Sequence, residues 1–331
     1  MRKDIIMKAR ILGKTNSLEV SAVGMGCMGF SHGYGAAPER GEAIRLIRLA
    51  HELGCTFFDT AEGYGAGHNE QLVGEALKPI RDKVVLATKL HIPELNGKSV
   101  SETVKEHLHA SMKRLQTDHI DLYYWHRVNP AVSLAEVAEA MGGLIKAGDI
   151  GGWGLSQVTE EQLRLAHSVT PLTAVQSEYS MMERMFEKDV IPACEELGVG
   201  FVPFSPLGAG FLSGKYSANE RYSGDDVRRV ITRFAPENVL ANQPLLDMLQ
   251  RFAEKKDASL AQIALAWLLH KKEFIVPIPG MRREERVREN LGSAEVKFTE
   301  DELAALEKAL SEIEIHGNRT DEDIAKLRYM D

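Results

Sequence analysis

The chain has 331 residues, 44% of them hydrophobic and 27% charged, which is usual for a globular protein with a large core. Its formal net charge of −8 argues against nucleic-acid or membrane partners, which attract positively charged proteins. No apolar run approaches membrane-spanning length, and the first residues lack a signal-peptide core. Three widely separated cysteines favour reduced thiols and no metal site, so we expect a cytoplasmic protein. The oligomeric state is left open.

Short apolar, strand-like runs alternate with longer helical patterns along almost the whole chain. A small hairpin is predicted around residues 8–20. Eight strands are predicted after it, at 23–27, 55–59, 83–88, 119–125, 150–155, 172–177, 199–203 and 274–277. Several of these runs are continuously apolar, which is typical of parallel strands buried on both faces.

Capping-box patterns predict where several helices begin. In the S/T-x-x-E/Q pattern, the first and fourth residues bond each other's backbone N–H groups. The pattern occurs at Ser99–Glu102, Thr159–Gln162, Ser259–Gln262 and Thr299–Glu302. The last of these starts an extra helix after the eighth strand. Gly54 and Gly198 are predicted to end helices in the left-handed conformation.

The alternation predicts an α/β fold, a (β/α)₈ TIM barrel with an N-terminal β-hairpin and an extra C-terminal helix. Because no break in composition divides the chain, we expect a single domain over residues 1–331. A doubly wound sheet would also alternate, but it seldom needs eight units. Residues 205–236 and the tail from 315 exceed ordinary loop length, which predicts functional or disordered segments.

A glycine-rich stretch after the first strand resembles a dinucleotide-binding fingerprint. Residues 24–29, GMGCMG, match G-x-G-x-x-G letter for letter. That fingerprint needs a helix to open inside it, whereas here FSHGYGAAP continues as a loop. We interpret the stretch as a tight strand exit in which small residues let a ligand approach the backbone.

Four residues with functional side chains, Asp59, Tyr64, Lys89 and His126, each follow an apolar run in three consecutive strand–helix units. The C-terminal ends of barrel strands meet at one face, so these side chains are predicted to converge there. Each residue alone has a structural alternative: a turn cap, a packing ring or a core histidine. Lys89 is harder to explain structurally, because a buried ammonium needs a partner, and Asp59 is the obvious one.

These four groups suit proton donation to a carbonyl oxygen. A tyrosine holds its proton at neutral pH, and a nearby ammonium stabilises the phenolate left after donation. An imidazole can hydrogen-bond the substrate oxygen and orient the carbonyl. The set cannot supply electrons, so the chemistry needs a bound hydride carrier.

Further strand ends suit the recognition of such a carrier. Ser156 and Gln176 can hydrogen-bond a carboxamide, and Phe204 can stack on a flat ring. The glycines that follow, together with Lys215, suit a segment that wraps phosphates. Capping and packing are the alternative explanations for these residues.

Arginines cluster at a helix start after the eighth strand, at positions 282, 283, 286 and 288. Guanidinium groups beside a helix N-terminus form a phosphate site. Glutamates at 284, 285 and 289 also allow a solvated, salt-bridged face.

The motifs DTAEGYG, ATK, IDLYYWH, GLSQ, VQSEYS, PFSPLGAGFLSGK and PG-x-RR…EN resemble, in order and spacing, those of the aldo-keto reductase superfamily. The likeness extends over residues 8–315. His126-Arg127 is similar to the bacterial and plant-like branch. The resemblance implies NADPH-dependent reduction of aldehydes or ketones. Tyr64 would be the general acid, Lys89 and Asp59 would tune it, and His126 would orient the substrate.

The resemblance also implies residues that bind NADP(H): Met28, Asp59, Ser156, Gln157, Gln176, Phe204, Ser205, Pro206, Leu207, Gly208, Gly210, Lys215, Gly280, Met281, Arg282, Arg286, Glu289 and Asn290. Among them, Arg282 and Arg286 would meet the adenosine 2′-phosphate. Met281 stands where the family often has Ser or Thr, which removes a hydroxyl contact to that phosphate.

The small-molecule carbonyl substrate is not identified by the sequence. Tyr34, Trp125 and Arg127 are the expected pocket residues. Two alternatives remain open: a cofactor-sensing regulatory subunit of a membrane channel with this fold, and a barrel isomerase or hydrolase that works without nicotinamide. Negligible turnover with capture of a protein partner would favour the first, and absence of NADPH binding the second.

Overall fold

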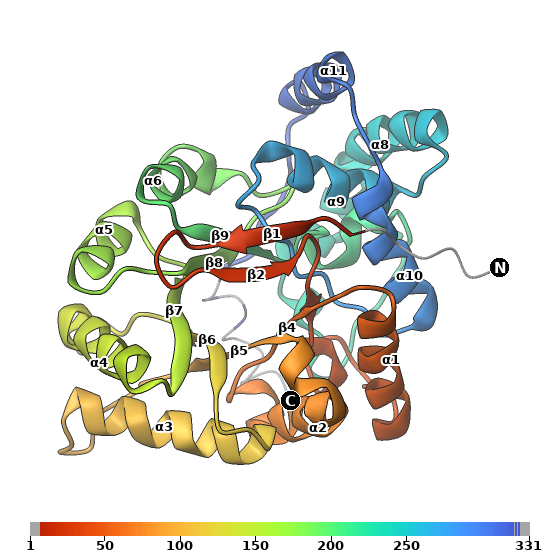
Figure 1. Ribbon diagram of the computed structural model, residues 1–331. Coiled ribbons are helices and arrows are strands. Elements are labelled where there is room, and N and C mark those ends of the chain that lie inside the picture. Colours follow the sequence, from red (N-terminus) through yellow and green to blue (C-terminus); the bar gives the residue numbers. More distant parts are fainter. Residues whose placement is uncertain (1–6, 321, 323, 325–331) are drawn as a thin grey trace.

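The computed structural model describes residues 7–320, 322 and 324, and within them seven parallel strands lie side by side in chain order, with helices around them (Figure 1). The strands are β3 (Met25–Gly26), β4 (Phe57–Asp59), β5 (Val85–Leu90), β6 (Ile120–Trp125), β7 (Ile150–Ser156), β8 (Ala174–Glu178) and β9 (Gly200–Phe204). The structure confirms the predicted barrel, with strand ends within a few residues of those predicted.

The predicted eighth strand, 274–277, is not a regular strand, yet it occupies the barrel position between β9 and β3. Toward β9, the Phe201 N–H donates to the Phe274 oxygen at 2.9 Å, and the stretch returns N–H bonds to the oxygens of Phe201 (2.9 Å) and Pro203 (3.1 Å). Toward β3, Pro277 and Pro279 accept bonds from Gly24 (2.9 Å) and Gly26 (3.1 Å). Proline has no N–H to return a bond, so only half of this ladder forms. The expectation of a full strand was wrong for this reason.

Helices connect and cover the strands: α1 (Arg40–Glu52), α2 (His68–Leu77), α3 (Val100–Leu115), α4 (Leu134–Ala147), α5 (Glu160–Val169), α6 (Val190–Leu197), α7 (Pro236–Ala241), α8 (Gln243–Lys256), α9 (Leu260–Lys271), α10 (Glu284–Gly292) and α11 (Glu300–Ser311). The capping boxes predicted for α3, α5, α9 and α11 are all present. Gly54 (φ 93°) and Gly198 (φ 68°) adopt the predicted left-handed conformation.

The N-terminal hairpin closes the N-terminal end of the barrel (Figure 1). It consists of the antiparallel strands β1 (Ala9–Leu12) and β2 (Leu18–Ser21). Leu12 and Val20 are buried in one apolar cluster with inward side chains of the strands, such as Leu122. This end of the barrel is therefore sealed by apolar packing, and polar groups are left to the opposite end.

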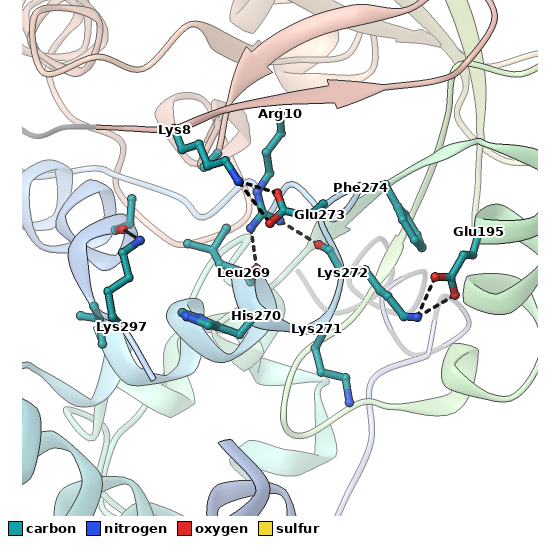
Figure 2. A pocket seen from close by; sticks show the side chains of 13 residues that line it. Lys8, Arg10, Glu195, Leu269, His270, Lys271, Lys272, Glu273, Phe274 and Lys297 are labelled. Atoms are coloured by element: carbon teal, nitrogen blue, oxygen red, sulfur yellow. Dashed lines mark hydrogen bonds and ion pairs between the residues drawn. The ribbon is translucent and has the colours of Figure 1, made fainter. Parts of the chain in front are cut away.

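A cavity of about 520 Å³ lies beside the hairpin (Figure 2). Lys8 pairs with Glu273 at 3.3 Å, and Arg10 donates to the main-chain oxygen of Lys272 at 2.9 Å. Arg10 also donates to the carbonyl of Leu269 near the end of α9. These contacts anchor the hairpin to α9, far from the C-terminal strand ends.

The long segment 205–236 is ordered and contains three short 3₁₀ turns among its described residues: η5 (Gly208–Ser213), η6 (Val227–Arg229) and η7 (Thr232–Phe234). Asp225 accepts from the Gly33 backbone N–H at 2.7 Å, and Val227 N–H donates to the Gly33 oxygen at 3.0 Å. The segment therefore reaches across to the loop that follows β3.

Leu12→Ala should lower the free energy of unfolding by about 2–5 kcal/mol, because it opens a void under the closed end of the barrel. Ile11→Ala is the matched control, since Ile11 is 50% exposed on the opposite face of the same strand. Urea denaturation of both variants checks this expectation. An equal loss for both would show that the hairpin does not seal the core.

Candidate active site

Polar and aromatic side chains gather at the C-terminal end of the barrel because side chains alternate along each strand. Ala87 and Leu122 belong to the inward cluster, so Lys89, two residues beyond Ala87, also faces inward. The inward strand ends are Asp59 (β4), Lys89 (β5), Ser156 (β7), Gln176 (β8) and Phe204 (β9), with His126 directly after β6. The predicted convergence is what the structure shows.

Lys89 is fully buried and is held by three oxygen atoms. Its Nζ lies 2.5 Å from Asp59 Oδ1, 2.7 Å from the Thr60 carbonyl oxygen and 3.3 Å from Tyr64 Oη. Burial alone would lower the pKa of Lys89, but the Asp59 carboxylate and the Tyr64 phenol raise that pKa above the ordinary lysine value. A charged ammonium is thus fixed beside the Tyr64 hydroxyl.

Gln176 holds the other oxygen of Asp59. Its Nε2 donates to Asp59 Oδ2 at 2.8 Å, and both side chains are only 2% exposed. The sequence predicted Gln176 as a carboxamide-binding residue and missed this bond. Gln176 therefore fixes the carboxylate that pairs with Lys89. The side-chain oxygen of Gln176, Oε1, takes no part in this bond.

His126 packs edge-on against Tyr64, with ring centroids 5.7 Å apart. Burial lowers the pKa of His126 well below its usual range, and the nearby Lys89 and Arg127 charges lower it further. The imidazole is therefore neutral at neutral pH. A neutral imidazole can donate one hydrogen bond to a substrate oxygen without carrying a charge of its own.

His32 also packs against the Tyr64 ring, and this contact was not predicted from the sequence. Its ring centroid lies 5.4 Å from that of Tyr64, and burial lowers its pKa. Its Nε2 is buried and has no hydrogen-bond partner among the described residues. The signal available in the sequence was a lone histidine inside the glycine-rich loop after β3.

The loop that carries Tyr64 is held by Glu62, which contacts the residue after β5 and a histidine of α3. Glu62 accepts from the His91 backbone N–H at 2.7 Å and contacts His107 Nδ1 at 2.8 Å. The hydrogen bond to Glu62 raises the pKa of His107. This pairing fixes the loop two residues before the phenol.

The expected nicotinamide residues lie around the ends of β7, β8 and β9. Ser156 is buried, and its Oγ accepts from Arg127 Nη1 at 3.0 Å. Gln157, at φ 56°, uses its Oε1 to accept from the Glu178 N–H at 2.9 Å. Phe204 is only partly buried, which leaves part of its ring open for stacking.

The expected pyrophosphate segment is tightly turned after β9. Its first residues, Ser205, Pro206 and Leu207, lead into η5, and Ser205, Gly208 and Gly210 have positive φ values of 48°, 56° and 98°. Within this segment, the Gly208 N–H donates to the Ser205 oxygen at 2.8 Å and the Gly210 N–H donates to the Leu207 oxygen at 3.0 Å. Lys215 is exposed at the end of this segment, and Met28 lies in the short turn Met28–Phe30 after β3.

The predicted phosphate arginines have partners within the protein. Arg282 Nη1 donates to the Tyr34 oxygen at 2.6 Å, so this arginine also anchors the loop after β3. Arg286 pairs with Glu289. Met281 is fully buried in the apolar core, so its side chain faces away from the arginines.

A nicotinamide nucleotide fits these residues. A Cβ added to Gly280 would meet no atom within 4 Å, so space is open beside it. Asn290 donates to the Gly280 oxygen at 3.2 Å, while its buried Oδ1 has no partner among the residues described. An amino group of a bound base could satisfy that oxygen.

Of the predicted substrate residues, Tyr34 and Arg127 are half-buried near the site, but Trp125 is not in the site. Trp125 is fully buried in the outer cluster between the strands and the helices. It is adjacent to His126, and neighbouring residues of a strand point to opposite faces. The expectation for Trp125 is corrected for this reason.

Three further observations concern the cysteines, metal binding and membrane-spanning helices. Cys27, Cys55 and Cys194 are buried and free. Among the described residues, no cluster of His, Cys, Asp and Glu side chains could hold a metal ion. No helix in the same residues is long and apolar enough to cross a membrane.

A family model and a known protein that match this chain agree with each other. The model of the Aldo/keto reductase family matches residues 22–311. A probable aldo-keto reductase 1 from Glycine max is 38% identical over 311 residues, which covers 92% of this chain and 90% of that protein.

Solved structures agree with these matches. A glycerol dehydrogenase from Gluconobacter oxydans superposes with a TM-score of 0.81 at 26% identity, covering 97% of this chain and 98% of the other. An aldo/keto reductase from Klebsiella pneumoniae, in complex with NADP and acetate, gives a TM-score of 0.73 at 25% identity, covering 96% and 99%. The chain therefore belongs to the aldo/keto reductase family.

Proposed function

We propose that this protein reduces aldehydes or ketones to alcohols with NADPH, and that Tyr64 is the general acid. The observation that carries the proposal is the buried Lys89 ammonium, 2.5 Å from Asp59 Oδ1 and 3.3 Å from the Tyr64 hydroxyl. Family membership supports an oxidoreductase. The NADP in the Klebsiella pneumoniae structure supports the choice of cofactor.

When bound, NADPH would supply a hydride to the carbonyl carbon, and residues of the protein would orient and protonate the carbonyl oxygen. Neutral His126 donates a hydrogen bond to that oxygen and orients the carbonyl. Tyr64 Oη gives its proton to the oxygen as negative charge develops there. The Lys89 ammonium stabilises the phenolate that remains.

The residues that would hold the cofactor would bind its nicotinamide, its pyrophosphate and its adenosine part. Ser156, Gln157 and Gln176 would bind the carboxamide, and Phe204 would stack on the ring. Residues 205–215 would cover the pyrophosphate, Arg282 and Arg286 would bind the 2′-phosphate, and Glu289 and Asn290 the adenine. The site would work within one barrel domain, residues 1–331, and in the cytoplasm, where its free cysteines stay reduced.

A panel of aldehydes and ketones, assayed by loss of NADPH absorbance, tests the proposed function. Turnover of several simple carbonyls is expected. Negligible turnover across the panel with NADPH still bound would overturn it in favour of a cofactor-sensing protein.

Tyr64→Phe should lower kcat by about 10²-fold or more and leave NADPH binding intact, because only the proton donor is lost. Tyr123→Phe is the matched control, since Tyr123 is fully buried in the outer cluster. Steady-state kinetics and NADPH fluorescence titration measure both effects. Near-normal turnover of Tyr64→Phe would reject the assignment.

Lys89→Met should abolish most activity and also lower stability. Asp59 would keep its bond from Gln176 but lose its ion-pair partner, at a cost of roughly 3–5 kcal/mol if the carboxylate stayed ionised. Thermal unfolding and residual kinetics check this, with Lys113→Met, at an exposed site on α3, as the control. A variant with unchanged stability and unchanged pH–rate profile would contradict the role given to Lys89.

Arg286→Ala should weaken NADPH binding by roughly 10–150-fold while NADH binding changes little, because one charge-assisted contact is lost. Arg282→Ala should weaken both cofactors, since Arg282 also bonds the Tyr34 carbonyl. Dissociation constants for the two cofactors measure the ratio. Arg288→Ala is the control, because Arg288 pairs with Glu284 on the same helix. Equal losses for NADPH and NADH in Arg286→Ala would show that Arg286 belongs to a solvated face.

A further inference from the structure

Tyr64 lies in a short loop that does little to fix its own shape. Gly63 and Gly65 flank the tyrosine and are exposed, and a Cβ added to Gly63 would meet no atom within 4 Å. Glycine restricts the backbone less than any other residue, so this loop keeps one conformation only if contacts elsewhere hold it. The proposed proton donor depends on those contacts, because its phenol must stay beside the Lys89 ammonium, 3.3 Å away.

Glu62 joins the Tyr64 loop to the strand that carries Lys89. Its backbone N–H donates to the Lys89 oxygen at 3.2 Å, and its Oε1 accepts from the His91 N–H at 2.7 Å. The Tyr64 N–H donates to the Ala61 oxygen at 3.1 Å, so a tight turn links Glu62 to the phenol. Glu62 therefore connects the loop of the proton donor to the end of β5.

His107, on α3, holds the same carboxylate from the other side. Its Nδ1 lies 2.9 Å from Oε1 and 2.8 Å from Oε2 of Glu62, and the two side chains are 31% and 14% exposed. A carboxylate only accepts hydrogen bonds, so Nδ1 carries a proton whether or not the ring is charged. Protonation of the other ring nitrogen turns this hydrogen bond into an ion pair, which is stronger.

Arg114, also on α3, cannot take the place of His107. Its Nη2 is 3.9 Å from Glu62 Oε2, whereas its Nε is 2.5 Å from Oε2 of the fully buried Glu70. Glu70 also accepts from Thr88 Oγ1 at 2.6 Å. A move of Arg114 toward Glu62 would leave the buried Glu70 carboxylate without its cation, which is strongly unfavourable.

Further titratable groups face the pair from neighbouring elements. Glu106, next to His107 on α3, also raises the His107 pKa and is itself paired with Lys98 at 2.6 Å. Tyr123, on β6, is fully buried, and burial raises its pKa well above the ordinary value, so it stays neutral. His91, after β5, contacts Glu62 through its backbone N–H. Among the described residues, the histidine side chain that meets the Glu62 carboxylate is that of His107.

We propose that Glu62 and His107 position Tyr64 for proton donation, and that their ion pair holds the Tyr64 loop more firmly than their neutral hydrogen bond does. The inference rests on the proposed function, and both residues act through Tyr64. The bond to Glu62 raises the pKa of His107 above the ordinary value of 6.5. The ion pair is therefore fully present below pH 6.5 and is lost as the pH rises through the higher pKa of the folded protein.

Variants of Glu62 test the positioning role. Glu62→Ala should slow NADPH oxidation in a single turnover by about tenfold or more, because the loop loses two hydrogen-bonding partners. The KM for the carbonyl and the dissociation constant of NADPH should stay close to those of the wild type, since only the proton donor is displaced. Glu62→Gln should be intermediate, because it still accepts from the His91 N–H. A normal single-turnover rate in Glu62→Ala would overturn the inference.

Variants of His107 test the role of its charge. The wild-type single-turnover rate should fall about three- to tenfold as His107 loses its proton, because a charged hydrogen bond becomes a neutral one. His107→Lys keeps a cation and should lack this fall, whereas His107→Gln should have the lower rate throughout. His109→Gln removes an exposed histidine from the same helix and should keep the wild-type profile. Identical profiles for wild type, His107→Lys and His107→Gln would contradict the role of the charge.

Hydrogen exchange of the backbone amides of residues 60–66 tests the same inference without turnover. After correction for intrinsic rates, protection should fall in Glu62→Ala, and in the wild type as His107 loses its proton, but not in His107→Lys. Thermal unfolding verifies that each variant is folded. Unchanged protection overturns the inference even if carbonyls are reduced. Reduced protection without any carbonyl turnover supports the hold on the loop and overturns only the proposed function.

Discussion

The buried ion pair between Lys89 and Asp59 is the constraint on which the rest of the site depends. Placing an ammonium in the barrel interior costs several kcal/mol unless its partners are well placed. Asp59 comes from β4, Lys89 from β5 and Gln176, which holds the second carboxylate oxygen, from β8. These three strands must therefore keep one register. The same ammonium that demands this order also lies 3.3 Å from the Tyr64 hydroxyl.

The barrel explains why much of the site could be predicted from the sequence. An inward residue that ends an apolar run must lie at the shared C-terminal face, so Asp59, Lys89, Ser156 and Phe204 could be placed from strand pattern alone. The same rule shows how Trp125 was misplaced. Strand side chains alternate, and one residue separates the outer core from the site. The hydrophobic run predicts the strand, but it does not show toward which face of the strand the last side chain points.

Contacts between distant loops could not be predicted in this way. Arg282 bonds a carbonyl 248 positions earlier in the chain, and no local pattern signals that contact. The same is true of Asn242, whose side chain bonds the backbone of His316, 74 positions later. The closing strand at 274–277 was predicted by its apolar residues, but its prolines leave half of one ladder unformed. The apolar pattern predicted a strand there, but the prolines of the segment itself have no N–H to donate to β3.

The two ends of the barrel differ in the residues that fill them. At the N-terminal end, Leu12 and Val20 fill the barrel interior with apolar atoms. At the C-terminal end, the buried polar residues Asp59, Lys89 and Gln176 lie on strands, whereas the backbone at positions 316 and 318 is held by Asn242 and Thr232. Among the described residues, the bonds that hold positions 316 and 318 go to Asn242 and Thr232 and not to β4 or β5, so a change at those positions would leave the Lys89–Asp59 pair untouched. Loops at this end can therefore change while the Lys89–Asp59 pair stays in place, which is how one barrel fold can serve many functions.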